Sequence, residues 1–291
     1  INMNIALTGS SGLIGSRLLH DLKKMHHTVS CISSSQSSPK DNIFSYEDMD
    51  AGNISLPIDC IVHLASINSE MHASDIADET AITEQIIKGM KTMGCKKLIF
   101  FSTAKVYGDN SFENIIFSES DPLVPSCPYS NAKMLCENII SSSSNATSFD
   151  YLIFRMPPVL IDSPKSNLGK LFQVVEKGIP IPSFRVGNLN KRSFLSYKFL
   201  VKILNTTLQD DSHFSNETLN LSDTNLVSTN ELLRNFASSI NKKLFIIYFP
   251  NFLFKAMLRI DKLQSILCRL FGNFHLSNAR LLNKFNSKDI D

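Results

Sequence analysis

The sequence lacks the features that would place it in several specialised classes. Its 29 Lys and Arg nearly balance 27 Asp and Glu, and no basic stripe or acidic tail stands out, which argues against nucleic acid as the main partner. No run of 18 uncharged apolar residues occurs, so we predict no membrane span. The composition also excludes collagen-like, coiled-coil and wholly disordered chains.

The six cysteines form no C-x-x-C pair, so the sequence predicts neither a metal site nor a redox pair. In a chain of 291 residues we interpret them as buried free thiols, which indicates a reducing compartment. The triplet Asn145-Ala146-Thr147 resembles a glycosylation acceptor, but no signal peptide precedes it. We therefore expect a cytoplasmic protein.

The hydrophobic content of 43% is enough to bury a sizeable core. Apolar strands alternate with helical segments over the first 155 residues, which is typical of an α/β protein with a doubly wound parallel sheet. The predicted strands are 3–7, 28–32, 60–65, 98–102 and 151–154. We predict a dinucleotide-binding, Rossmann-type domain over 1–157, with later segments returning to its sheet, and a small C-terminal substrate-binding domain over 158–291.

A G-x-x-G-x-x-G pattern lies between the first strand and a helix. The pattern consists of Gly9, Gly12 and Gly15, and helical spacing of apolar residues begins at Ile14. Glycines there permit a tight turn and a close approach of the backbone to a pyrophosphate at the helix N-terminus. A glycine pattern alone also fits an ordinary turn, but the flanking strand and helix favour a dinucleotide site.

The second strand ends in a place that commonly carries an acidic residue for the adenosine ribose. Here Ser33-Ser34-Ser35 occupies it, and Lys40 is the nearest basic residue. This composition leaves NAD and NADP open as cofactors and favours NADP. His63 lies inside the apolar run of the third strand, where a hydrogen-bonded core histidine is a better interpretation than a catalytic one.

Tyr129 and Lys133 lie four residues apart at the start of a predicted helix and so share one face. A nearby ammonium favours the phenolate and is expected to lower the pKa of the tyrosine. Such a tyrosine exchanges a hydroxyl proton while a hydride moves to or from nicotinamide. Thr103 ends a strand at the same edge of the sheet, where its hydroxyl is a further catalytic candidate.

Four motifs occur in order: T-G-S-S-G-L-I-G (8–15), H-L-A-S (63–66), F-S-T-A-K-V-Y-G (101–108) and Y-S-N-A-K (129–133). Together they resemble the extended short-chain dehydrogenase/reductase family, in its nucleotide-sugar epimerase/dehydratase branch. The resemblance implies catalysis by Thr103, Tyr129 and Lys133. It implies cofactor contacts by Tyr129 and Lys133 and by Gly9, Gly12, Leu13, Ile14, Gly15, Ser33, Ser34, Leu64, Ala65, Ser66 and Pro158.

Further segments resemble motifs of 4-epimerase-like proteins and of 4-ketoreductases that act on UDP-sugars for surface polysaccharides. They lie at 155–160, 165–168, 178–182 and 190–194. This resemblance implies hydride transfer at C4 of a UDP-hexose or UDP-N-acetylhexosamine. It also implies substrate contacts by Thr103, Asn167, Leu168 and Arg192, with Arg192 on the diphosphate.

The chain departs from the family pattern at three places. Glu79-Thr80 stands where the family has an Asn, Leu160-Ile161 replaces a Tyr, and residues 284–287 replace an L-G-W-x-P element. Because the catalytic residues are present, we favour an enzyme, either a 4-epimerase or a 4-ketoreductase. The alternative is a non-catalytic NAD(P)-binding regulatory or scaffold protein on the same fold.

Two expectations concern surfaces. The family resemblance implies a homodimer through the helix at 83–93 and the helix that begins at Tyr129, both of which have more apolar positions than one buried face needs. A second amphipathic helix is predicted over 252–271, after a strand at 244–249. Core packing or a partner surface explains this helix better than contact with a membrane.

Overall fold

The computed structural model describes residues 2–34, 38–54, 56–67, 71–161, 163 and 166–285. Its main body is a seven-stranded parallel sheet in the order β11-β7-β5-β4-β1-β2-β3. The strands are β1 (Asn4–Thr8), β2 (Thr28–Ser33), β3 (Ile43–Ser45), β4 (Cys60–His63), β5 (Lys97–Thr103), β7 (Asp150–Met156) and β11 (Glu217–Asn220). The Rossmann-type α/β class is therefore confirmed.

The chain fills the sheet outward from β1, first through β2 and β3 and then, on the other side, through β4, β5, β7 and β11. The order of strands thus reverses between β1 and β4. Ligands of such sheets bind at this switch point, beyond the carboxyl ends of the strands. The ends of β1, β4 and β5 therefore define where the functional site lies.

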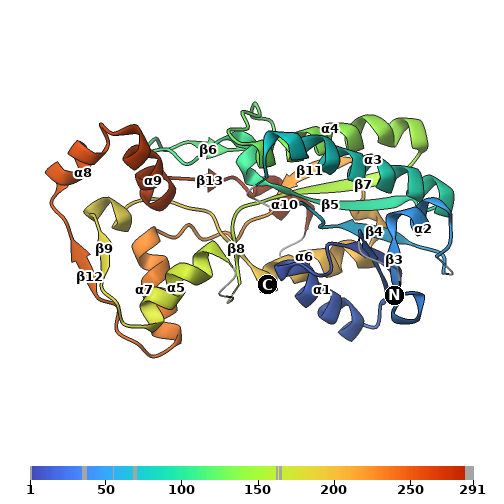
Figure 1. Ribbon diagram of the computed structural model, residues 1–291, viewed down its shortest axis with the longest axis horizontal. Helices are drawn as coiled ribbons and strands as arrows, with labels where there is room; N and C mark the ends of the chain where they lie inside the picture. Colours follow the sequence, from blue (N-terminus) through green and yellow to red (C-terminus); the bar gives the residue numbers. More distant parts are fainter. Residues whose placement is uncertain are drawn as a thin grey trace.

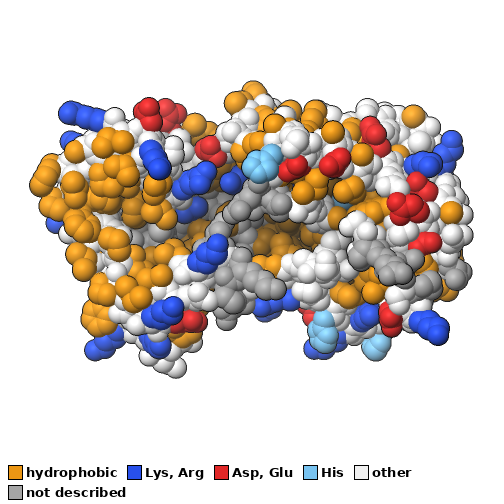
Figure 2. Space-filling view, viewed as in Figure 1, with side chains coloured by type: hydrophobic (Ala, Val, Ile, Leu, Met, Phe, Trp, Pro, Cys, Tyr) orange, Lys and Arg blue, Asp and Glu red, His pale blue; other side chains and the backbone are white. Residues whose placement is uncertain are grey.

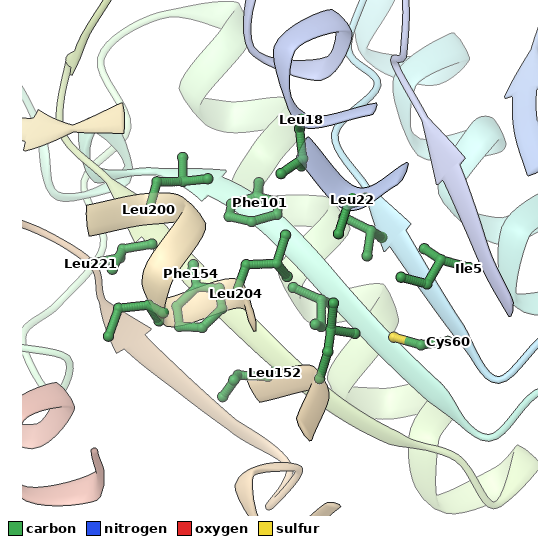
Figure 3. Close-up of a cluster of buried hydrophobic side chains, with 14 of the residues drawn as sticks. Ile5, Leu18, Leu22, Cys60, Phe101, Leu152, Phe154, Leu200, Leu204 and Leu221 are labelled. Carbon is green, nitrogen blue, oxygen red and sulfur yellow. The ribbon is translucent and has the colours of Figure 1, made fainter. Parts of the chain in front are cut away.

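Helices cover both faces of the sheet, as Figure 1 shows. One face packs against α1 (Leu13–Lys24) and α6 (Tyr197–Gln209), and Figure 3 shows part of the resulting core, in which Leu18 and Leu204 surround Phe101. The other face packs against α2 (Tyr46–Asp50), α3 (Ile76–Met93) and α4 (Pro128–Thr147). Because both faces are covered, the strands are almost continuously apolar.

A smaller part, at the left of Figure 1, lies beside the sheet domain. It contains α5 (Asn167–Glu176), β9 (Ile181–Ser183), α7 (Thr229–Ser239), β12 (Ile246–Tyr248), α8 (Asn251–Met257) and α9 (Asp261–Phe271). Two short strand pairs run between the parts: β8 (Val159–Leu160) with β10 (Leu195–Ser196), and β6 (Ile116–Phe117) with β13 (His275–Leu276). The last helix, α10 (Ala279–Lys284), lies against β11.

Three boundaries differ from the sequence prediction. The helix expected at 83–93 begins at Ile76, and the helix expected at 252–271 is two helices, because the backbone of Ile260 is extended between α8 and α9. Later segments were expected to return to the main sheet, but Leu195 pairs with β8 in a separate two-stranded sheet. The segment that does return is β11.

The homodimer through α3 and α4 that the family resemblance implies stays a prediction, but the apolar positions on these helices give it no support. Ile86, Ile87, Met90 and Ile140 were counted as surplus apolar positions, yet all four are buried in the core between these helices and the sheet. Ile139 is partly buried against the same core.

All six cysteines are unpaired, as the free-thiol interpretation predicted. Within the part of the chain that the structure describes, no helix has the length and apolar character needed to cross a membrane.

Candidate functional site

The glycine loop packs directly against the end of β4. Gly9 has a left-handed φ of +71°, and a Cβ on it would lie 2.7 Å from the backbone nitrogen of Ala65. A Cβ on Gly15 would lie 2.0 Å from the carbonyl oxygen of Gly9. Any side chain at either position would displace the backbone, so the first and third glycines are required for the loop to form.

Gly12 has a different role, because it opens α1. It is the N-cap residue, and no side chain caps the helix there. A Cβ on Gly12 would lie 3.2 Å from the carbonyl oxygen of Gly9, which is tight but does not forbid the fold. The N-terminus of the twelve-residue helix α1 offers free N–H groups, and Gly12 has no side chain to keep a pyrophosphate away from them. The loop therefore suits a dinucleotide.

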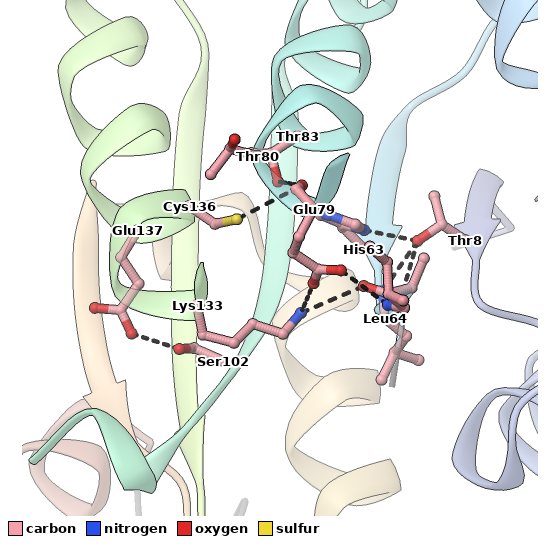
Figure 4. Close-up of polar contacts among 12 residues, drawn as sticks. Thr8, His63, Leu64, Glu79, Thr80, Thr83, Ser102, Lys133, Cys136 and Glu137 are labelled. Carbon is pink, nitrogen blue, oxygen red and sulfur yellow. Dashed lines mark hydrogen bonds and ion pairs between the residues drawn. The ribbon is translucent and has the colours of Figure 1, made fainter. Parts of the chain in front are cut away.

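Thr8 joins the ends of β1 and β4. Its Oγ1 accepts hydrogen bonds from the backbone N–H groups of Leu64 and Ala65, at 3.1 and 3.0 Å. It also lies 2.7 Å from Nδ1 of His63 (Figure 4). Because the oxygen already accepts two hydrogen bonds, its own hydrogen points to His63, whose pKa burial and Lys133 lower well below the usual value. His63 is therefore a neutral core histidine, as predicted.

The remaining predicted cofactor residues lie at the same edge of the sheet, apart from Pro158. Ser33 ends β2 half-buried, and Ser34 beyond it is exposed. Ser66 follows β4, and its buried Oγ has no hydrogen-bond partner among the described residues. A buried hydroxyl without a partner costs free energy unless a ligand or water supplies one, so Ser66 also fits a bound cofactor. Pro158 is exposed, and its carbonyl accepts from Leu195.

Thr103, Tyr129 and Lys133 come together where α4 begins. Pro128 occupies the first position of α4, which places Tyr129 and Lys133 on one face a turn apart. Thr103 ends β5, and its side chain lies near enough to Tyr129 to lower the pKa of that hydroxyl. Lys133 is buried, and its ammonium donates to the carbonyl oxygen of Ala65 at 3.3 Å, next to the glycine loop.

Lys133 has an ion-pair partner that the sequence did not predict. Its Nζ lies 3.0 Å from Oε1 of Glu79, and the two side chains are only 2% and 3% exposed. The second oxygen of Glu79 accepts from the backbone N–H of Ile67 at 2.8 Å. Figure 4 shows Glu79 between Lys133 and the loop that follows β4. The only signal in the sequence was that a Glu replaces the family's Asn.

Burial, with a smaller contribution from Glu79, raises the pKa of Tyr129 above its usual value. Lys133 and Thr103 lower the pKa but do not outweigh these two causes. The pKa of Lys133 is itself raised, because Glu79 and Tyr129 outweigh the opposing effect of burial. Lys133 therefore lowers the pKa of Tyr129 as predicted, but the net pKa is raised because burial has the larger effect.

A second buried ion pair lies near Thr103 and Lys133. The guanidinium of Arg155 on β7 contacts both carboxylate oxygens of Glu137 on α4, at 2.6 to 3.1 Å, and donates to Tyr107 at 2.9 Å. Ser102 also donates to Glu137. Tyr107 in turn donates to Asn220 on β11 at 2.8 Å. This network fixes β5, β7 and α4 relative to one another and was not predicted.

Apart from Thr103 at the end of β5, the predicted substrate residues lie outside the sheet domain. Asn167 and Leu168 open α5 after the N-cap residue Ser166. Arg192 lies beside Phe194, with its guanidinium carbon 5.3 Å from the ring centroid, and it donates to the carbonyl oxygen of Leu270 at 3.5 Å. Burial lowers the pKa of Arg192 to about 10, which leaves it charged at neutral pH. No carboxylate among the described residues pairs with it.

Figure 2 shows the surface hollowed between the two parts of the molecule. A glycine cradle at the switch point, beside a Thr, a Tyr and a Lys at the ends of β5 and α4, defines a dinucleotide-binding protein of the short-chain dehydrogenase/reductase class. Residues 5–222 match the NAD dependent epimerase/dehydratase family. The chain belongs to this family.

Relatives and solved structures agree with this assignment. The chain is 26% identical to a UDP-glucose 4-epimerase of Vibrio cholerae over 94% of this chain and 87% of that protein. Its fold is similar to that of a UDP-N-acetylglucosamine 4-epimerase from Bacillus cereus, with a TM-score of 0.71, 20% identity and coverage of 85% and 86%. A UDP-glucuronic acid 4-epimerase from Bacillus cereus in complex with NAD gives a TM-score of 0.70 at 19% identity, over 85% and 87% of the two chains.

Proposed function

We propose that this protein is an NAD-dependent nucleotide-sugar 4-epimerase that acts at C4 of a UDP-hexose or UDP-N-acetylhexosamine. The observation that carries the proposal is that Thr103, Tyr129 and Lys133 converge beside the glycine cradle. A non-catalytic protein would have no need to keep this set together. The named activities of the Vibrio cholerae and Bacillus cereus proteins support the same reaction.

The bound dinucleotide supplies the acceptor and donor of hydride, and the residues of the chain handle the proton. Tyr129 takes the proton of the C4 hydroxyl when that carbon is oxidised and returns one to the C4 oxygen when the ketone is reduced. Thr103 lies near Tyr129, and we propose that it orients the tyrosine. Lys133 lies next to Tyr129 and donates to the carbonyl oxygen of Ala65 in the loop after β4. We propose that its charge stabilises the phenolate and that its hydrogen bond holds the backbone that binds the cofactor.

The smaller part provides the contacts to the nucleotide. Arg192 carries a permanent charge without a carboxylate partner among the described residues, and its planar fork can take two diphosphate oxygens. Leu168 and Asn167 lie at the start of α5, and we propose that they contact the sugar–diphosphate region.

The end of β2 governs the choice between NAD and NADP. Ser33 and Ser34 place no carboxylate there to repel a 2′-phosphate, so we propose that NADP binds at least as well as NAD. Isothermal titration with each cofactor measures this directly, and a strong preference for NAD would contradict it.

Product analysis tests the proposed reaction. We expect the protein, incubated with NAD and UDP-glucose or UDP-N-acetylglucosamine, to form the C4 epimer without net change in absorbance at 340 nm. A 4-ketoreductase would instead consume reduced cofactor in proportion to a 4-keto substrate. If neither substrate class reacts while NAD binds, the proposed activity is wrong although the cofactor site is right.

A further inference from the structure

The end of the smaller part carries a surface that the proposed reaction does not use. It contains β12, α8 and α9, and we call it the apolar–basic surface. Its large apolar side chains remain exposed, with Phe252 at 73%, Phe245 at 57%, and Ile247 and Ile260 each at 54%. Figure 2 shows hydrophobic side chains gathered over this end of the molecule. Soluble single chains seldom expose so many neighbouring apolar side chains without a binding role.

The exposure is not a failure of α8 to pack. Leu253, Phe254, Met257 and Leu258 face inward against Phe184 and α9, which confirms core packing for most of the predicted amphipathic face. The opposite face of α8 carries Phe252 and Lys255, three residues apart and both exposed, and the exposed Arg259 lies in the turn after the helix. The helix α8 therefore packs one apolar face against the core and exposes a further large apolar side chain, Phe252, to solvent.

The neighbouring helix α9 repeats this arrangement. Leu267 and Phe271 are buried against the same core. Lys262, Ile266 and Arg269 are exposed at positions four and three residues apart, and therefore share the outer face. Both helices thus present apolar and basic side chains together on the side that faces solvent.

The charge of this surface is strongly one-sided. Residues 242–269 contain six Lys or Arg and one Asp, a net charge of +5, whereas the whole chain has a net charge of +2. None of these six cations forms an ion pair among the described residues. The basic excess of the chain is therefore concentrated at the place where apolar side chains are exposed.

Three occupants could cover such a surface: a second copy of the chain, an acidic soluble partner or an anionic bilayer. A symmetric dimer would bring each patch against itself and confront its cations with the same cations, which opposes association. An anionic bilayer attracts the cations and receives the apolar side chains at its interface. We propose that β12, α8 and α9 form a docking surface for anionic membranes, so that the protein binds a bilayer peripherally without spanning it.

Vesicle co-sedimentation tests the proposal without any assay of activity. We expect the full chain to bind vesicles of equimolar phosphatidylglycerol and phosphatidylcholine, to bind pure phosphatidylcholine much less, and to dissociate as salt is raised. Ile247→Glu/Phe252→Glu should weaken binding on the order of tenfold or more, because two buried apolar contacts become charges. Lys255→Glu/Lys262→Glu should weaken it by a similar factor.

Leu56→Glu is the matched control, because Leu56 is an exposed apolar residue near the start of β4 on the sheet domain. It should bind vesicles as the unaltered chain does, and circular dichroism should show all variants folded. Equal binding of Ile247→Glu/Phe252→Glu and the unaltered chain would overturn the proposal. So would a dimer, seen by light scattering, that this variant dissociates, or tighter binding to a soluble polyanion that the variant leaves unchanged.

Discussion

At the scale of single residues, the carboxylate of Glu79 opposes the effect that the Lys133 ammonium has on the pKa of Tyr129. The ion pair is buried, so water screens it little. Because the pKa of Tyr129 is raised, the proposed proton transfer from the C4 hydroxyl to Tyr129 is favoured at higher pH or next to a further positive charge.

We predict that Glu79→Gln lowers the pKa of Tyr129. The amide keeps a hydrogen-bond acceptor for Ile67 but no longer neutralises Lys133, so the cation stabilises the phenolate. The measurement is the tyrosinate absorbance of the variant minus that of the same variant with Tyr129→Phe, followed against pH. The pH–rate profile for sugar oxidation should move in the same direction.

The exposed Glu84 lies on the same helix, and Glu84→Gln should leave this titration unchanged. Lys133→Met should instead raise the pKa of Tyr129, because the cation is lost and the Glu79 carboxylate is left unpaired. Unchanged titration in both Glu79→Gln and Lys133→Met would show that the pair does not act on Tyr129.

Tyr129→Phe should reduce turnover by roughly 10²–10⁴-fold, the usual contribution of a general acid–base group. The ring is kept, so cofactor affinity and melting temperature should stay close to those of the unaltered protein. Steady-state kinetics with a UDP-sugar check this, and near-normal turnover would remove Tyr129 from the mechanism.

At the scale of elements, substitutions at the glycines of the first loop should affect either dinucleotide binding or stability, depending on the position. Gly12→Val should abolish dinucleotide binding and leave the protein folded, because the added Cβ meets only the Gly9 carbonyl at 3.2 Å and otherwise projects over the cradle. Gly15→Ala should instead lower the melting temperature, because its Cβ overlaps the Gly9 carbonyl oxygen. Calorimetry and thermal melts on both variants distinguish the two effects.

The ion pair of Glu137 and Arg155 is expected to dominate the cohesion of α4 with β7. Arg155→Met should destabilise the fold by about 3–5 kcal/mol, because it leaves a buried carboxylate without its partner. Glu137→Leu/Arg155→Met should cost clearly less, since no buried charge remains. Urea unfolding of the single and double variants measures this difference, and additive losses would argue against a coupled pair.

At the scale of the whole molecule, the proposed site takes its residues from both parts. The sheet domain presents the glycine cradle, and the smaller part presents Arg192, which α9 holds through the carbonyl of Leu270. Mutations should therefore be able to weaken the binding of the nucleotide sugar without weakening the binding of the cofactor.

We predict that Arg192→Lys raises the KM for a UDP-sugar more than it lowers kcat. Lysine keeps the charge but loses the bidentate fork, and the diphosphate is distant from C4. Titrations with UDP and with NAD should show weakened UDP binding only. Lys191→Ala, at the exposed neighbouring position, should change neither. Weakened NAD binding with unchanged UDP binding would place Arg192 in the other site.

The sequence alone determined the features that depend on local order. The glycine loop between β1 and α1, the alternation of strands and helices, and the spacing of Tyr129 and Lys133 are all contained in short segments, because backbone geometry and helical periodicity act over a few residues. They were sufficient for the class of fold and for the family.

Only the tertiary structure decided which distant side chains meet. Glu79 and Lys133 lie on different helices, and the network around Arg155 joins the strands β5, β7 and β11 to α4. The burial that raises the pKa of Tyr129, and the packing that leaves Phe252 exposed while Phe254 is covered, arise from elements far apart in the chain. Periodicity indicates that a residue has a buried face, but the folded chain alone decides what that face contacts.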